Sequence, residues 1–345
     1  MAGPMIKRKS LTERVKEAYA ENRRLAAPLV GFPGCDILGV SIKVAQQNHG
    51  VHYNCIDAMV YQLKPDAAFM MMDLSVEANA LGLQVRFPVH ESSTVEHHPI
   101  RRIEDLDRFR YINILQDARV QSYIKTVEMM RTGLPDDVLV GAYITGPFTL
   151  AGLLGGAEQV AMDSVLAPDK LETLCRFSTA IIQDYARALI NAGADLLCVL
   201  EPTAVILGPQ QFERFSAVYV RYIIESCKYA GVDTIYHICG NSMHLIESMA
   251  ESGVAAISLD SPQTGVNMVK AAERAGQEVI VVGNINPTLV MKDGSPADVE
   301  KACRCLLEDM RPYPNFMLST GCDLPPGVPL ENMHAFMQTA RDFQG

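Results

Sequence analysis

The sequence predicts an α/β protein of one domain, folded as a (β/α)8 TIM barrel. Short apolar runs alternate along the chain with longer amphipathic segments, and eight of the runs have the length of a buried strand. No proline- or serine-rich linker divides the 345 residues. A barrel of this kind takes about 250 residues, or over 400 with insertions. We therefore expect residues 1–345 to form a single barrel.

The eight runs define the predicted strands, because each is apolar and is bounded by glycine, proline or polar residues. In chain order they are Pro28–Phe32, Ala68–Asp73, Leu139–Ile144, Leu196–Glu201, Asp233–Ile238, Ala256–Asp260, Val279–Gly283 and Asn315–Ser319. A doubly wound open sheet is the competing architecture. No glycine-rich phosphate-binding loop follows an early strand, so the closed barrel is favoured.

Amphipathic segments between these runs predict the helices. The clearest are Asp169–Ala192, Gln210–Ala230 and Pro296–Asp309. The connection over 74–137 is longer than one crossover helix requires, and its part Leu81–Ile100 alternates as a hairpin does. We expect 74–137 to be a small excursion with a hairpin and a helix after the second strand, not a second domain.

Composition and charge exclude several classes of protein. Hydrophobic residues make up 48% and charged residues 20% of the chain, which is typical of a globular protein. Lys and Arg number 30 against 40 Asp and Glu, a net charge of −10 that argues against a nucleic-acid partner.

Neither a membrane span nor a signal peptide is expected. Residues 138–156 carry no charge, but Gly146 and Pro147 in mid-span would interrupt a membrane helix, so a strand, a turn and a helix start fit better. The charged N-terminal segment lacks the apolar core of a signal peptide. We expect a cytoplasmic protein without a membrane partner.

Reactive side chains follow the predicted strands. Barrel enzymes carry their chemistry at the carboxyl ends of the strands. Here those ends hold Phe32, Asp73, Thr145, Glu201, His237 with Cys239, Asp260, Asn284 and Cys322. Carboxylates, a histidine and two cysteines on one rim predict an active site.

A zinc site is the most specific prediction. His237 and Cys239 lie two residues apart at a strand end and can face the same side, and imidazole with thiolate is a zinc donor pair. Cys322 follows another strand, beside Gly321, and supplies a third ligand. Three protein ligands leave the fourth position open, as in catalytic zinc sites. Asp260 could fill that position or lie behind it. The alternative is that these cysteines are ordinary small core residues.

Three other carboxylates are candidate functional groups. Glu201 ends an apolar run, where an unpaired charge would be costly, so we predict a catalytic role for it. Asp73 and Glu77 are four residues apart and would share a helix face, but Asp73 also fits as the N-cap of that helix.

Several segments together resemble the uroporphyrinogen decarboxylase superfamily. In this sequence they are Thr145–Ala151 (TGPFTLA), Glu201–Ala204 (EPTA), His237–Gly240 (HICG), Gly283–Pro287 (GNINP) and Ser319–Cys322 (STGC). GPFTLA and GNINP mark the superfamily, whereas the HxC with a distant cysteine resembles its zinc- and corrinoid-dependent methyltransferase branch.

This resemblance implies zinc ligands, partners and an activity. His237, Cys239 and Cys322 match the zinc ligands of the branch, and Asp260 occupies a position where family members have a glutamate near the metal. Asp260 is accordingly predicted to act beside the metal, although its shorter side chain puts direct coordination in doubt. The implied cofactors are zinc and a cobalamin carried by a separate corrinoid protein. The implied reaction is methyl transfer to or from cobalt.

Two methyl-transfer substrates remain open. Few basic residues lie at the strand ends, whereas Phe32, Phe69, Met70–Met72, Tyr143 and Phe148 could form an apolar pocket. The sequence therefore leans towards an aromatic methyl ether, as in O-demethylases, over a thiol such as coenzyme M, whose sulfonate calls for a cationic clamp.

The remaining alternatives are a decarboxylase and a non-catalytic barrel. A decarboxylase acting on a substrate with many carboxylates needs a cationic pocket, and the family resemblance implies that such an enzyme has arginines in the first barrel loop. Between residues 25 and 85 the only lysine or arginine residues are Lys43 and Lys64, and none is an arginine. This argues against the decarboxylase.

Overall fold

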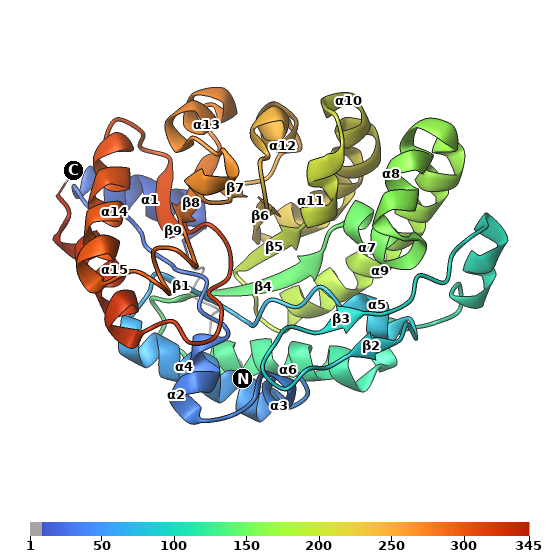
Figure 1. Cartoon of the computed structure of the whole chain (residues 1–345), viewed down its shortest axis with the longest axis horizontal. Helices are drawn as coiled ribbons and strands as arrows, with labels where there is room; N and C mark the ends of the chain where they lie inside the picture. Colours follow the sequence, from blue (N-terminus) through green and yellow to red (C-terminus); the bar gives the residue numbers. More distant parts are fainter. Residues whose placement is uncertain (1–8, 345) are drawn as a thin grey trace.

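A computed structural model describes residues 9–344, and residues 1–8 of the charged N-terminal segment and residue 345 lie outside that range. Its centre is a seven-stranded sheet in the order β1–β4–β5–β6–β7–β8–β9, parallel throughout and curled into a barrel (Figure 1). The strands are β1 (Ala67–Phe69), β4 (Leu139–Thr145), β5 (Leu196–Leu200), β6 (Asp233–Ile238), β7 (Ala256–Leu259), β8 (Ile280–Ile285) and β9 (Phe316–Thr320).

The first predicted strand, Pro28–Phe32, is wrong. The segment 25–27 occupies the eighth position instead, with a single parallel bridge from Ala26 to Leu318 of β9. Its backbone exchanges hydrogen bonds with Leu318 on one side (2.9 and 3.0 Å) and accepts one from Asp66, before β1, on the other (3.0 Å). Pro28 has no backbone N–H to extend this ladder of hydrogen bonds, so the pairing with β9 ends before it. The predicted (β/α)8 barrel is confirmed, with its first strand reduced to a bridge.

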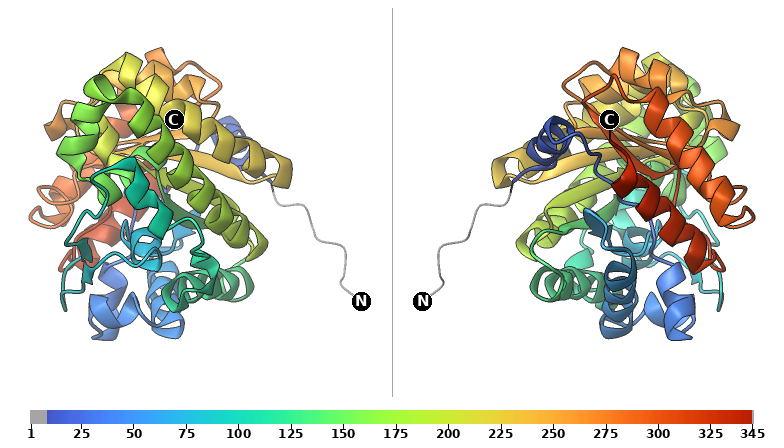
Figure 2. Two further views of the ribbon diagram at one scale, coloured as in Figure 1. Left: turned by 90° about the vertical axis from the view of Figure 1, so that its right-hand side faces the viewer. Right: turned by 90° about the vertical axis from the view of Figure 1, so that its left-hand side faces the viewer.

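Helices form the outer layer on the two sides shown in Figure 2. They are α1 (Leu11–Ala20), α2 (Pro33–Leu38), α3 (Ile42–Ala45), α4 (His49–Leu63), α5 (Val76–Ala80), α6 (Ala118–Gly133), α7 (Pro147–Gly155), α8 (Ala157–Leu166), α9 (Pro168–Asn191), α10 (Pro209–Phe212), α11 (Val218–Ala230), α12 (Ile246–Glu251), α13 (Met268–Ala275), α14 (Pro296–Asp309) and α15 (Leu330–Asp342). The predicted helices become α9, α14 and a series of α10, a π-helical turn and α11.

The long connection between β1 and β4 contains a small antiparallel hairpin. Its strands are β2 (Val85–Arg86) and β3 (Thr94–Val95), and α5 and α6 complete the connection. The hairpin lies near α5 and α6 at the edge of the barrel in Figure 1. Its tip, residues 87–93, reaches a cavity described below.

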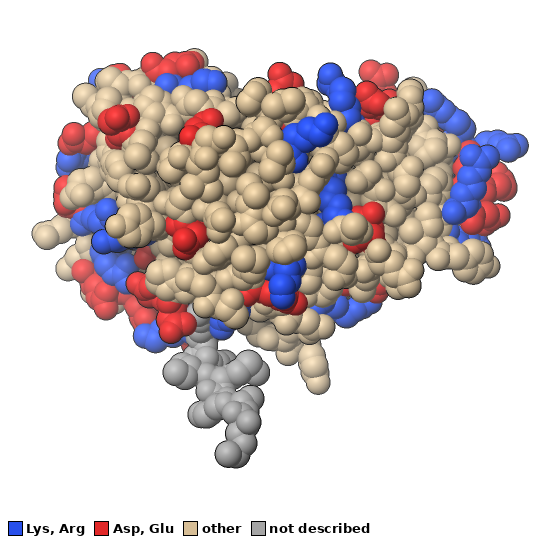
Figure 3. All heavy atoms as spheres, turned by 90° about the horizontal axis from the view of Figure 1, so that it is seen from below, with Lys and Arg blue, Asp and Glu red and all other residues tan. Residues whose placement is uncertain are grey.

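The uncharged stretch 138–156 forms β4 and α7, as predicted. Within residues 9–344, none of the helices combines the length and the apolar character needed to cross a membrane. Figure 3 shows acidic and basic side chains interspersed on the face seen there, without a continuous basic region.

Candidate metal centre

The structure brings His237, Cys239 and Cys322 together. His237 is on β6, Cys239 directly follows that strand, and Cys322 lies two residues beyond β9. His237 Nε2 is 3.1 Å from Cys239 Sγ and 3.8 Å from Cys322 Sγ, and the two sulfurs are 3.5 Å apart. These three atoms thus surround one point.

The three donors suit a zinc ion. Bonds of about 2.0–2.3 Å in a tetrahedron place neighbouring ligand atoms about 3.3–3.8 Å apart. The observed separations of 3.1, 3.5 and 3.8 Å agree with that range within a few tenths of an ångström. One nitrogen and two sulfurs form a donor set that zinc favours, and a fourth position is left for a substrate.

A glycine turn and one tight backbone contact bring these strand ends together. Gly240, directly after Cys239, has φ +83°, which favours glycine and turns the chain away from the site. A Cβ on Gly321 would lie 2.5 Å from the backbone nitrogen of Ser261. Glycine at this position therefore lets the segment after β9 approach the segment after β7, which carries Cys322 to its partners.

Ser258 orients the histidine. It pairs with His237 across the β6–β7 ladder, and its hydroxyl is 3.0 Å from His237 Nδ1. In the tautomer in which Nδ1–H donates to this hydroxyl, Nε2 keeps its lone pair and faces the thiols, as is usual for histidines that bind metals. The only local signal for Ser258 in the sequence is a hydroxyl within an apolar run, which did not single it out.

Asp260 accepts hydrogen bonds from the backbone of two loops beside the site. Its Oδ2 accepts a hydrogen bond from the Gly240 N–H at 2.7 Å and its Oδ1 accepts one from Ser261 N–H. Its carboxylate is not among the donor atoms that lie within 4.8 Å of one another in the described part of the chain. The arrangement places Asp260 behind the ligands, and a catalytic role for it stays a prediction.

Glu201 directly follows β5 and is fully buried, and its carboxylate lies at the start of α7. Its carboxylate accepts hydrogen bonds from Phe148 N–H (2.9 Å), Thr149 N–H (2.8 Å) and Ser216 Oγ–H (2.7 Å). Burial raises the pKa of Glu201, while these bonds lower it. A Cβ on Gly146 would collide with this carboxylate. Glu201 thus anchors α7, and its predicted catalytic role has no contact with the cysteines to support it.

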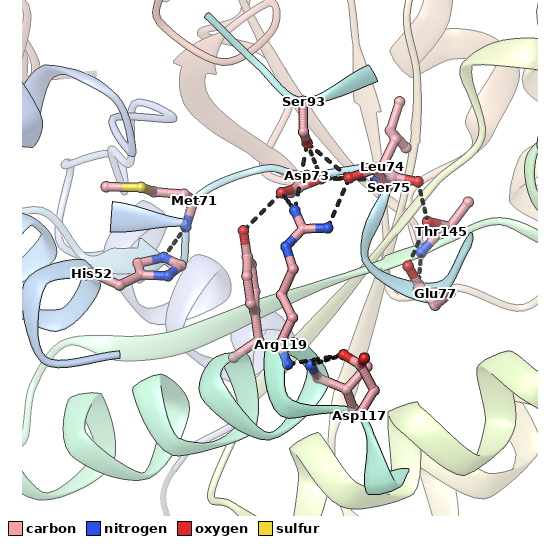
Figure 4. A network of polar contacts seen from close by, with 12 residues as sticks. His52, Met71, Asp73, Leu74, Ser75, Glu77, Ser93, Asp117, Arg119 and Thr145 are labelled. Carbon is pink, nitrogen blue, oxygen red and sulfur yellow. Dashed lines mark hydrogen bonds and ion pairs between the residues drawn. The ribbon is translucent and has the colours of Figure 1, made fainter. Parts of the chain in front are cut away.

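Asp73 does not cap a helix, because Ser75 occupies the N-cap of α5. Asp73 instead pairs with Arg119 of α6, and both side chains are buried. Figure 4 shows the Arg119 guanidinium directed at Asp73, Ser75 and Ser93. Ser93 belongs to the hairpin and donates to Asp73 at 2.8 Å, which ties the hairpin tip to the barrel.

Further contacts reinforce this ion pair. Tyr123 Oη donates to Asp73 at 2.9 Å, and the Arg119 guanidinium lies 4.7 Å from the ring centre of Phe87. Beside it, Glu77 accepts hydrogen bonds from the N–H and hydroxyl of Thr145 (2.8 and 2.9 Å). Burial raises the pKa of Glu77 to about 7. Arg119 was not predicted, because it lies in the first turn of α6 without any local signal for a buried ion pair.

A cavity of about 400 Å³ adjoins Cys322 and runs to the hairpin tip. Its lining includes Phe32, Met72, Asp73, Glu91, Cys322 and Asp323. Two of the residues expected in an apolar pocket, Phe32 and Met72, are among them, whereas Phe148 is buried in the core. Oδ2 of Asp323 is buried without a hydrogen-bond partner, and burial raises the pKa of this carboxyl group to about 8.

Comparison with known proteins identifies relatives over most of the chain. It is 26% identical over 285 residues to the methylcobamide:CoM methyltransferase MtbA of Methanosarcina mazei, covering 81% of this chain and 80% of that protein. It is also 26% identical over 277 residues to the uroporphyrinogen decarboxylase of Geotalea uraniireducens, covering 77% of each.

Solved structures support the fold. A methyltransferase from Methanosarcina mazei matches 98% of this chain and 100% of its own, with a TM-score of 0.86 at 22% identity. A B12-independent methionine synthase from Shewanella sp. W3-18-1 matches 92% of this chain and 97% of its own, with a TM-score of 0.60 at 12% identity. At these identities the likeness concerns the fold.

The family assignment made from the sequence is confirmed. The methyltransferase relatives also agree with the enzyme class expected from the HxC and the distant cysteine. The family model described as uroporphyrinogen decarboxylase (URO-D) matches residues 37–343, and the chain therefore belongs to the uroporphyrinogen decarboxylase family.

Proposed function

We propose that this protein is a zinc-dependent methyltransferase that moves a methyl group between the cobalt of a corrinoid protein and a small thiol. The observation that carries the proposal is the convergence of His237, Cys239 and Cys322 beside a cavity open to a small molecule. The names of the methylcobamide:CoM methyltransferase relatives support a thiol as the acceptor. The aromatic ether favoured by the sequence analysis has no such support.

The residues of the chain provide positioning. His237, Cys239 and Cys322 would hold the zinc, and Ser258 would keep the imidazole in the required tautomer. When bound, zinc supplies a Lewis acid that lowers the pKa of a thiol, about 8.5 when free, and so favours the thiolate. The cavity orients the rest of the acceptor, and alignment with the methyl group accounts for much of the rate.

Methyl transfer from cobalt to the thiol forms one bond and breaks one bond at the methyl carbon. The acceptor sulfur forms a bond to the methyl carbon while the carbon–cobalt bond breaks, the electron pair stays on cobalt and the thiol proton is released. No other oxidant or reductant is consumed. The decarboxylase alternative is disfavoured because neither lysine nor arginine lines the cavity in the described part of the chain.

The test combines metal content with methyl transfer. Purified protein should contain about one zinc per chain and should transfer a methyl group from free methylcobalamin to a small thiol. Cys239→Ala and Cys322→Ala should lose both properties, whereas Cys305→Ala, which removes an exposed cysteine elsewhere, should keep them. Zinc-loaded protein that demethylates an aromatic ether but leaves every thiol unmethylated would overturn the choice of acceptor.

A further inference from the structure

The cavity beside Cys322 has an unusual charge for a site expected to hold the thiol of a sulfonate. Among the described residues its lining includes three carboxyl groups, those of Asp73, Glu91 and Asp323, and neither lysine nor arginine. His90 is the one lining side chain that can carry a positive charge. A sulfonate or carboxylate usually requires a cationic clamp.

Arg119 does not supply that clamp. It lies behind Asp73, is itself buried and pairs with that carboxylate. Its second terminal nitrogen donates to Ser75 Oγ at 2.9 Å. The positive charge is thus already balanced by Asp73, and recruiting it to a ligand would leave a buried carboxylate unpaired, which is costly.

Of the other two carboxyl groups, only Glu91 is accessible to a ligand. Glu91, at the hairpin tip, is exposed to solvent and lines the cavity. Asp323 follows Cys322 directly, and its buried Oδ2 has no hydrogen-bond partner in the structure. That oxygen is closed off from solvent, and the backbone N–H groups of Gly31 and Leu324 stabilise the same carboxylate, so Asp323 is not expected to contact a ligand.

We propose that the cavity selects a small thiol whose other end is a hydrogen-bond donor carrying positive charge, such as an ammonium group, and discriminates against thiols with an anionic end. The thiol would lie at Cys322, and its head group would face Glu91 in a cavity that neither lysine nor arginine lines among the described residues. The proposal rests on the proposed function for the thiol and adds the chemistry of the rest of the substrate.

Three thiols with the same two-carbon spacer give a matched test. They are 2-aminoethanethiol, 2-mercaptoethanol and 2-mercaptoethanesulfonate, whose heads are cationic, neutral and anionic. Binding to the zinc-loaded protein is measured by isothermal titration calorimetry, and methyl transfer from methylcobalamin is measured in parallel. We expect affinity to fall along this series, by about five- to tenfold at each step at low salt, with smaller steps at high salt.

Substitution of Glu91 separates the charge of the cavity from the acidity of each thiol. Glu91→Gln should weaken binding of the amine about threefold, strengthen binding of the sulfonate by a similar factor and leave the neutral thiol unchanged. Glu96→Gln is the matched control, because Glu96 is a hairpin carboxylate near Arg86 (4.0 Å) that does not line the cavity. It should leave all three affinities unchanged.

The outcomes are distinguishable. If the sulfonate binds as well as the amine or better, the charge selectivity is wrong while thiol methylation can still stand. If Glu91→Gln and Glu96→Gln shift the series equally, the hairpin tip does not face the head group and the proposal fails. If none of the three thiols binds or is methylated, the proposed function fails as well.

Discussion

The molecule contains two groupings of two cysteines and one histidine, and only one of them forms a possible metal centre. Cys35 of α2 and Cys55 of α4 have their sulfurs 3.9 Å apart, and His52 lies one turn before Cys55 on α4. At the barrel mouth, Cys239 and Cys322 are 3.5 Å apart and His237 joins them.

The difference lies in what the histidine nitrogen contacts. His52 Nε2 accepts a hydrogen bond from the Met71 N–H at 2.8 Å, so its lone pair is in use, and burial lowers the pKa of His52 to about 3. His237 is held through Nδ1 by Ser258, which leaves Nε2 facing the thiols. Residue types alone are therefore insufficient, because among the described residues only His237, Cys239 and Cys322 bring one ligand atom each within 4.8 Å of one another.

The largest expected effect is on zinc content. Cys239→Ala should remove essentially all bound zinc, whereas Cys55→Ala should keep it and lower the free energy of unfolding by about 1–2 kcal/mol through a small core cavity. Elemental analysis and urea denaturation measure the two quantities. Zinc loss in Cys55→Ala with an intact fold would break the comparison.

Oxidation should also distinguish the two cysteine pairs. In zinc-free protein, diamide should couple Cys239 to Cys322, because these thiols are adjacent and half-buried. Cys35 and Cys55 are buried in the core and should stay reduced. Peptide mapping by mass spectrometry identifies the disulfide, and zinc loaded beforehand should prevent it. A Cys35–Cys55 disulfide forming first would contradict this expectation.

The two histidines should differ in their effect on pH dependence. His52 has a lowered pKa in the folded state, so it binds a proton in the unfolded chain first, and stability is lost as the pH falls below about 6.5. We expect a loss of about 2 kcal/mol between neutral pH and about pH 5 from this residue. Urea denaturation of the zinc-free protein measures it.

His52→Gln is the control for that measurement. The glutamine amide oxygen can accept the Met71 N–H but does not titrate, so the acid-side slope should become shallower by about one proton. An unchanged slope would mean that another group causes the pH dependence.

The smallest expected effect concerns Ser258. Ser258→Ala should weaken zinc binding by about tenfold, because the ring of His237 loses its orienting partner. Ser258→Thr keeps the hydroxyl and should restore most of the affinity. Chelator competition measures the zinc affinity. If both variants behave alike, packing rather than the hydroxyl is responsible.

Most of the barrel could be predicted from the sequence because its strands are apolar, short and separated by strong helix signals. Residues 233–238 and 296–309 form β6 and α14 with the predicted bounds. The first strand was misplaced because Pro28–Phe32 is apolar like a strand, whereas strand pairing depends on a free backbone N–H, which Pro28 lacks.

The site was predictable where its residues are close in sequence or follow strand ends. His237 and Cys239 share a strand end, and Cys322 follows another, so parallel topology brings them to one rim. Neither Ser258 nor Arg119 has such a local signal in the sequence. Their roles depend on partners far along the chain, which residue type and spacing do not specify.

By itself the sequence determined the α/β barrel, the family and the three metal-binding candidates, because hydrophobic periodicity and strand alternation are local properties. Only the tertiary structure decided which histidine keeps a free nitrogen, where the carboxylates of Asp260 and Glu201 point, and what charge lines the cavity. These features depend on contacts between residues distant in sequence, and those contacts exist only once the barrel has closed.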